Sequence, residues 1–226
     1  MVGLDLAGKT TDRTVMAVAS SPAGGRPSFD LVSRTADGHR LPDVSGLADM
    51  LSGYSPDLVA IDAPLSLPHQ VVRADGACRR CFGEEADGSY TQRAADRADH
   101  WTEIGHVEKP PMPTVMLAGV AFRAIYLNRL LAARDVAVIE TWPTGVLRAL
   151  GAADAPRKRE EGAYVVWARA ALDGAGFEVP ASTRTTDEVD AVAAAVAAWE
   201  HVAGRTVGVG DDEGRIWVPD RRVADA

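Results

Sequence analysis

The first part of the chain alternates short apolar segments with turn-forming residues. The first ten residues read as an apolar strand, and the patterns at 14–19 and 29–33 indicate two further strands. A Ser/Pro/Gly-rich stretch at 20–27 separates the second strand from the third. This opening therefore predicts a meander of three antiparallel strands.

Helical and strand-like patterns alternate along the rest of the chain. Strands are expected at 58–62 and 136–140, and helices at 44–53, 114–133, 143–151, 158–175 and 185–203. A hairpin is expected at about 205–219. The order predicts a single α/β domain over residues 1–226, with a mixed five-stranded sheet and helices on both faces.

The segment from about 63 to 113 has a different character. It begins with a proline-rich run that fits neither a helix nor a strand, and it is rich in arginine and histidine. We interpret it as an insertion after the fourth strand, beside the functional site. Its Cys78 and Cys81 form half of a possible Zn²⁺ site that His69, His100 or His106 would complete, but ordinary free thiols are the favoured interpretation.

Composition restricts the environment and the partners. The chain is 46% hydrophobic, its apolar runs are shorter than a membrane span, and it has two cysteines, which together predict a cytoplasmic protein without a membrane partner. The net charge of −8 argues against a broad nucleic-acid-binding surface, although it allows a local basic groove. Nothing in the sequence points to a particular oligomeric state.

Several carboxylates stand where they need an explanation. Asp5 interrupts an apolar strand, where a buried charge is costly unless it is paired or bound to a cation. Asp62 and Glu140 end the fourth and fifth strands, and Asp187 and Asp190 open the long alanine-rich helix at 185–203. We expect these acids to converge.

Converging carboxylates suit two-metal hydrolysis of a phosphodiester. Mg²⁺ or Mn²⁺ ions prefer such hard oxygen ligands, and Asp187 and Asp190, three residues apart, share a helix face. The alternative for this pair is helix capping, because Thr185 to Glu188 has the form of a capping box. Asp62 and Glu140 have a similar alternative as caps of the segments that follow them.

Cationic residues supply candidate substrate contacts. Lys158 is expected at the start of its helix, where it would meet a scissile phosphate, and Arg93 and Arg97 would do so from the insertion. The alternative for each is a solvated surface position. A phosphate-loop pattern also begins at Gly3, but strands rather than a loop and a helix surround it, so nucleotide hydrolysis by that route is disfavoured.

The order of elements and the acids resemble the RNase H-like superfamily, particularly Holliday-junction resolvases of the RuvC type. Four segments, 3–8 (GLDLAG), 61–65 (IDAPL), 139–143 (IETWP) and 187–191 (DEVDA), resemble the family called domain of unknown function 429, predicted to be RNase H-like nucleases. The resemblance covers nearly the whole chain.

The resemblance implies a set of site residues. Asp5, Asp62 and Asp190 would be metal ligands, with Asp187 or Glu140 as a fourth, and Lys158 resembles a lysine in the corresponding resolvase helix. Arg93 to Asp96 resembles an R-x-x-D segment of the family's insertion. Asp62 stands where resolvases usually have Glu, and the acidic pI also departs from the resolvases.

The sequence therefore predicts a metal-dependent nuclease that uses Mg²⁺ or Mn²⁺ and acts on structured or single-stranded nucleic acid. The alternative is a non-catalytic protein of the same fold that binds a small ligand or a protein partner through its acidic cleft.

Overall fold

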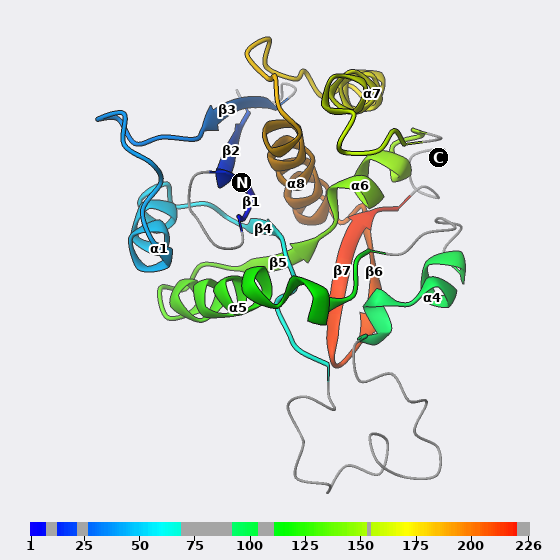
Figure 1. Ribbon diagram of the computed structural model, residues 1–226. Helices are drawn as coiled ribbons and strands as arrows, with labels where there is room; N and C mark the ends of the chain where they lie inside the picture. The colour runs from blue at the N-terminus through cyan, green and yellow to red at the C-terminus, as the bar shows by residue number, and fades with distance from the viewer. Residues whose placement is uncertain (8–12, 22–26, 69–91, 104–110, 153–154, 221–226) are drawn as a thin grey trace, which may run out of the picture.

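A single mixed sheet forms the centre of the protein (Figure 1). The computed structural model describes the chain except for residues 8–12, 22–26, 69–91, 104–110, 153–154 and 221–226. Its strands lie in the order β3-β2-β1-β4-β5-β7-β6. Their bounds are β1 Val2–Asp5, β2 Val15–Ser20, β3 Ser28–Val32, β4 Val59–Asp62, β5 Val138–Thr141, β6 Thr206–Asp211 and β7 Gly214–Pro219.

The strand directions confirm the predicted RNase H-like architecture. Strands β1 to β3 form an antiparallel meander, while β4 runs parallel to β1 and β5 runs parallel to β4. The prediction of five strands was too low, because the described residues form a sheet of seven. The C-terminal hairpin of β6 and β7 joins the edge of the sheet through the parallel pairing of β7 with β5. Such a pairing between distant segments leaves no local sequence pattern.

Helices cover both faces of the sheet (Figure 1). Helices α1 (Val44–Gly53) and α5 (Ala118–Ala132) pack on one face, where Leu47, Leu51, Leu127 and Leu131 are fully buried. Helix α8 (Thr186–Val202) covers the other face, flanked by α6 (Pro143–Ala149) and α7 (Glu161–Gly174). None of the described helices is long and apolar enough to cross a membrane.

Helix α8 lies unusually close to β1. A Cβ added to Gly3 would stand 2.1 Å from the backbone nitrogen of Ala195 and 2.2 Å from the carbonyl oxygen of Ala191. Only a residue without a side chain fits between this strand and this helix. The alanines along α8 are fully buried, so small residues on both elements let the two backbones approach.

Two predicted helices begin differently from the prediction. The segment at 114–133 starts with a 3-10 turn, η3 (Thr114–Leu117), before α5 begins at Ala118. The helix predicted from 158 begins at Glu161, so Lys158 lies in the turn that precedes α7. This position places its side chain on a short connection rather than on a rigid helix.

The described part of the predicted insertion packs against the C-terminal hairpin. It contains a 3-10 turn, η2 (Ala94–Asp96), and a short helix, α4 (Ala98–Glu103), and η2 contacts both β6 and β7. Cys78, Cys81, His69 and His106 lie outside the described residues, as does the side chain of His100. The suggested Zn²⁺ site therefore stays a sequence-based expectation.

Candidate active site

Asp5 and Asp62 lie side by side at the ends of two adjacent strands. In the parallel pairing of β1 with β4, Asp5 is the register partner of Asp62. Side chains alternate between the faces of a sheet, so Asp5 shares the face on which Gly3 contacts α8. Among the described residues, no hydrogen bond or ion pair occupies either carboxylate. Both carboxylates are thus available to a ligand.

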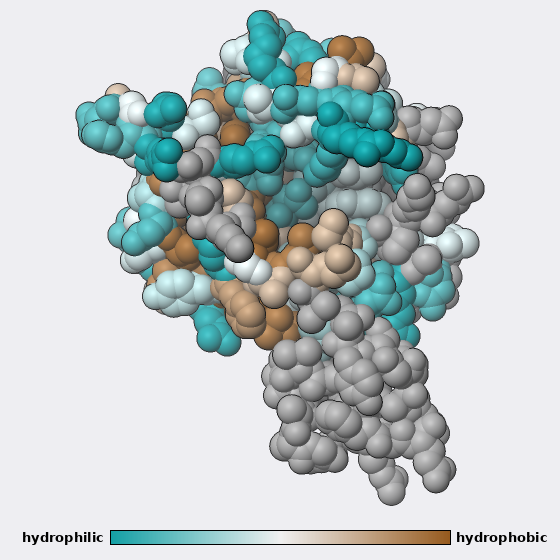
Figure 2. Space-filling model, viewed as in Figure 1, coloured by the Kyte–Doolittle hydropathy of each residue, from teal (hydrophilic) through white to brown (hydrophobic). Residues whose placement is uncertain are grey.

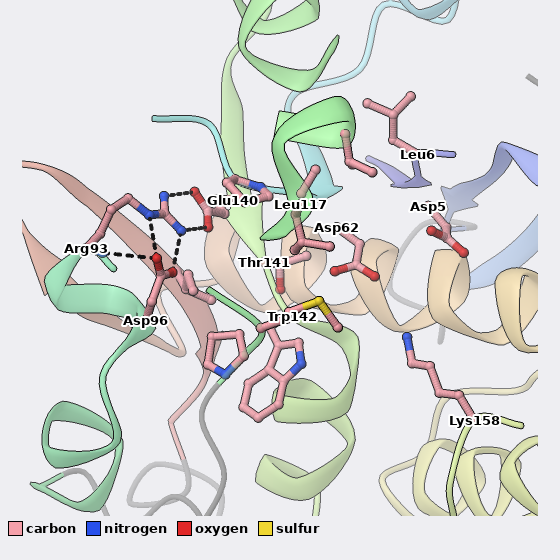
Figure 3. Close-up of a pocket in the computed structure, with 16 residues that line it drawn as sticks. Asp5, Leu6, Asp62, Arg93, Asp96, Leu117, Glu140, Thr141, Trp142 and Lys158 are labelled. Carbon is pink, nitrogen blue, oxygen red and sulfur yellow. Dashed lines mark hydrogen bonds and ion pairs between the residues drawn. The ribbon is translucent and has the colours of Figure 1, made fainter. Parts of the chain in front are cut away.

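Asp190 reaches the same place from the first turns of α8. Its side chain is buried, with the residue 1% exposed, and both of its oxygens have partners. Oδ2 accepts a hydrogen bond from Lys158 Nζ at 2.5 Å, and Oδ1 accepts one from the Tyr164 hydroxyl at 2.8 Å. Figure 3 shows the Lys158 amine directed toward Asp5 and Asp62.

Asp187 faces a different cation. Arg13 Nε donates to Asp187 Oδ2 at 2.8 Å and its Nη2 donates to Oδ1 at 3.1 Å, so the guanidinium engages both oxygens. The Arg13 side chain is 69% exposed, which makes this an open ion pair of small energetic value. The predicted capping box is also present, because Thr185 and Glu188 bond to each other's backbone nitrogens. Asp187 therefore lies at the rim of the group.

Burial raises the pKa values of the three central acids, Asp5, Asp62 and Asp190, and neighbouring carboxylates add to the shift. Burial, followed by repulsion from Asp62 and Asp190, raises the pKa of Asp5 well above its usual range. Burial raises the pKa of Asp62 to about 7, with Lys158 opposing the shift and Asp190 adding to it. Burial also raises the pKa of Asp190 against the opposing attraction of Lys158. A buried group of acids with raised pKa values is typical of a functional site.

Lys158 is the cation within this group. Burial lowers its pKa, but the attraction of Asp190 and then Asp62 outweighs burial and holds the pKa well above its usual range. The Lys158 side chain is 51% exposed along its length although its amine meets a carboxylate that is 2% exposed. The residue therefore stays charged and reaches the acids from the solvent side.

Glu140 occupies a different place from the other predicted acids. It pairs in register with Ile61, which packs in the core beneath α1 and α5, so its side chain points to the opposite face from Asp62. There Arg93 donates to Glu140 Oε1 at 2.6 Å and to Oε2 at 2.7 Å. The backbone nitrogen of Leu65 also donates to Oε2 at 2.8 Å. The strand alternation that brings Asp5 and Asp62 together thus separates Glu140 from them.

Arg93 lies at the centre of a buried ion-pair network. The residue is 0% exposed and bonds Asp96 at 2.9 Å and the Ser66 hydroxyl at 2.9 Å in addition to Glu140. Asp96 also accepts a hydrogen bond from the Thr114 hydroxyl at 2.8 Å. The network joins the insertion to β5 and to the segment that follows β4 (Figure 3). Arg97 lies directly after η2 and is half-buried.

A cleft of about 360 Å³ connects the acids with this network. Asp5, Asp62 and Lys158 line one part of it, and Arg93, Asp96 and Glu140 line another. The remaining wall is largely apolar and includes Met112, Leu117, Val120, Trp142 and Ile216. Figure 2 shows hydrophobic residues gathered over η3 and α5, where Met116, Phe122 and Tyr126 are more than half exposed. The cleft therefore offers charge at one end and apolar surface beside it.

Sequence reasoning missed two residues of the site. Tyr164 holds Asp190 from α7, and Arg13 holds Asp187 from the segment just before β2. Neither belongs to a motif, and each meets its partner only through the tertiary fold.

The carboxylates are hard oxygen donors of the kind that Mg²⁺ and Mn²⁺ prefer. As they stand, no group of three or more His, Cys, Asp and Glu side chains among the described residues is placed to hold a metal ion. Asp5 and Asp62 present free oxygens, while Asp190 turns its oxygens to Lys158 and Tyr164. The donor chemistry fits a divalent cation, with Asp5 and Asp62 as the available ligands.

Residues 3–215 match the profile of a family described as "Protein of unknown function (DUF429)". The chain belongs to this family. DUF429 thus covers every acid discussed above, from Asp5 to Asp190. No curated protein matches the chain.

Two solved structures resemble this DUF429 protein in overall shape. One is Thermus thermophilus RuvC in complex with a Holliday junction substrate, with 16% identity and a TM-score of 0.44. The other is a structure of Thermus thermophilus RuvC, with 14% identity and a TM-score of 0.39. In each comparison 90% of this chain and 97% of the other chain are covered. Similarity at this level does not identify the function of the site, and the assignment of its residues rests on their geometry in this protein.

Proposed function

We propose that this protein is a metal-dependent hydrolase of phosphodiester bonds that acts on nucleic acid. The observation that carries the proposal is the register pairing of Asp5 with Asp62, two adjacent carboxylates in a cleft that have no hydrogen-bond partner within the described part of the chain. The ion pair of Asp190 with Lys158 lies on the same face of the sheet, next to α8. Buried acids in this arrangement cost stability, and binding a cation offsets that cost.

Asp5 and Asp62 would hold a Mg²⁺ or Mn²⁺ ion, while Asp190 stays bonded to Lys158 and Tyr164 beside it. Such an ion would polarise a phosphoryl oxygen and activate water as the nucleophile. Asp187 and Glu140 are more remote candidates, because Arg13 and Arg93 already engage both oxygens of each.

The chain's own residues supply two further functions. Lys158 carries a positive charge into the cleft and is placed to meet a phosphate oxygen of a substrate. Tyr164 fixes the orientation of Asp190 through its hydroxyl group. Arg93 is buried and fully engaged, so we assign it to holding the cleft wall rather than to substrate contact.

The proposal is tested by Mn²⁺-dependent cleavage of a panel of single-stranded, duplex and four-way-junction DNA and RNA. We expect cleavage of at least one substrate by the wild type and a loss of roughly a hundredfold or more in Asp5→Asn, because the change removes a metal ligand. Asp30→Asn is the matched control, since Asp30 is exposed on β3 of the same sheet. Equal cleavage by the wild type and Asp5→Asn would contradict the proposal.

The apolar part of the cleft favours a second candidate, a protein of this fold that binds a small ligand without catalysis. Met112, Leu117, Val120 and Trp142 line the wall beside the acids, and small-molecule sites combine such surfaces with few polar groups. This candidate predicts ligand binding that does not depend on Mn²⁺ and is unchanged in Asp5→Asn. Metal-dependent cleavage would exclude it as the main function.

A further inference from the structure

Lys158 brings a positive charge to the acids of the cleft. Its Nζ is 2.5 Å from Asp190 Oδ2, and Figure 3 shows it directed toward Asp5 and Asp62. The other oxygen of Asp190 is engaged by Tyr164, which itself lies below the ammonium, with Nζ 5.8 Å from its ring centroid. The ammonium is therefore held by a carboxylate and an aromatic ring together.

The remaining acids do not offer a second site. Asp187 is engaged at both oxygens by Arg13, and Glu140 points to the opposite face of the sheet, where Arg93 engages both of its oxygens. Of the five acids, Asp5 and Asp62 are the two whose carboxylates have no hydrogen bond or ion pair to any residue that the structure describes. These two ligands, from adjacent strands, suffice for one ion with water in its other positions.

Charge balance points the same way. When Asp5, Asp62 and Asp190 are all ionised, the Lys158 ammonium neutralises one of the three charges. One divalent ion neutralises the rest. A second divalent ion would place a doubly charged cation next to the ammonium, with no carboxylate left to separate them.

We propose that this site binds one divalent ion, between Asp5 and Asp62, and that the Lys158 ammonium takes the position of the second. In hydrolysis the Lys158 ammonium would stabilise negative charge on the phosphate beside Asp190. The ion would do so beside Asp5 and Asp62, at the ends of β1 and β4. The inference rests on the proposed function, because it assumes that the acids bind a divalent cation. It changes the expected mechanism from two metals to one metal and one lysine.

The test counts Mn²⁺ ions by the loss of the free-ion paramagnetic resonance signal, at millimolar Mn²⁺ and without substrate. We expect one bound ion in the wild type and two in Lys158→Met, which keeps an unbranched side chain one atom shorter and removes its charge. The two ions of that variant should show the spin coupling of a carboxylate-bridged pair. Circular dichroism checks that each variant is folded.

Two matched variants make the result specific. Lys158→Arg keeps the cation and should bind one ion, and Arg159→Met removes an adjacent exposed cation and should also bind one. Two ions in the wild type, or a single ion in Lys158→Met, would overturn the inference and leave the proposed function standing. No bound ion in either protein would overturn both.

Discussion

At the scale of single residues, strand alternation decides which acids form the site. Asp5 and Asp62 face α8, whereas Glu140, the register partner of Ile61, faces the other side of the sheet. A carboxylate that ends a strand is recognisable in the sequence, but its face depends on the exact strand register. The sequence therefore allowed the prediction that Asp5 and Asp62 are neighbours. It did not allow a prediction of the buried ion pair between Glu140 and Arg93.

The raised pKa of Asp62 predicts that this residue destabilises the metal-free protein at neutral pH. The pKa of Asp62 is about 7 in the folded state and near 4 when unfolded, so the folded protein holds this proton more tightly. The free energy of unfolding therefore falls as the pH rises from about 4 to about 7, because ionising Asp62 costs more in the folded state. In EDTA, Asp62→Asn should raise the free energy of unfolding on the order of 1–3 kcal/mol at pH 8. The gain should shrink steadily between pH 7 and pH 5.

Thermal unfolding followed by circular dichroism at pH 5 and pH 8 measures this difference. Asp30→Asn, on the exposed side of β3, should show no such pH-dependent gain. A melting temperature of Asp62→Asn at or below that of the wild type at pH 8 would show that Asp62 is not strained in the metal-free site.

At the scale of elements, the close contact of α8 with β1 brings Asp190 to Asp5. Gly3 leaves room for the backbone of α8, and the buried alanines at 191, 194 and 195 form the facing surface. The alanine-rich helix was recognised from the sequence, but the function of Gly3 was not, because a glycine in a strand has several explanations. The close contact between β1 and α8 is therefore needed both to pack the core and to bring Asp190 to Asp5.

Gly3→Ala should separate these two elements. The added Cβ would lie 2.1 Å from backbone atoms of α8, which cannot move away as a flexible side chain can. We expect a loss of about 3 kcal/mol or more in the free energy of unfolding, together with weaker Mn²⁺ binding. Denaturant unfolding and Mn²⁺ titration measure the two effects.

Gly162→Ala is the matched control within a helix. Gly162 lies in α7 with nothing within 4 Å of an added Cβ, so this change should be neutral or stabilising by about 0.5–1 kcal/mol. Equal stability of Gly3→Ala and the wild type would show that the contact between β1 and α8 is less tight than described.

At the scale of the whole molecule, the order of elements was predictable and the extent of the sheet was not. The meander, the two parallel strands and the helices on both faces follow from local periodicity and short connections. The addition of β7 beside β5 joins segments about 75 residues apart and depends on burial of Ile216 and Val218 in the final fold. Likewise Tyr164 and Arg13 reach the acids only through tertiary packing.

The net charge of −8 also acts at this scale. It weakens nonspecific attraction to nucleic acid, so the proposed binding of nucleic acid would have to come from the cleft and from the cations it holds. Of the described cations in that cleft, Arg93 is fully engaged by ion pairs with Glu140 and Asp96. Lys158 and a bound metal ion would therefore supply the positive charge that binds a phosphate. The position of the metal ion therefore decides where a phosphate can bind.

Anomalous diffraction from crystals soaked in millimolar Mn²⁺ locates that ion directly. We expect one strong peak within about 2–2.5 Å of carboxylate oxygens from both Asp5 and Asp62. The same peak should be absent from crystals of Asp5→Asn. Without a peak between these two residues in the wild type, or with the ion bound elsewhere in the cleft, the proposed site would be contradicted.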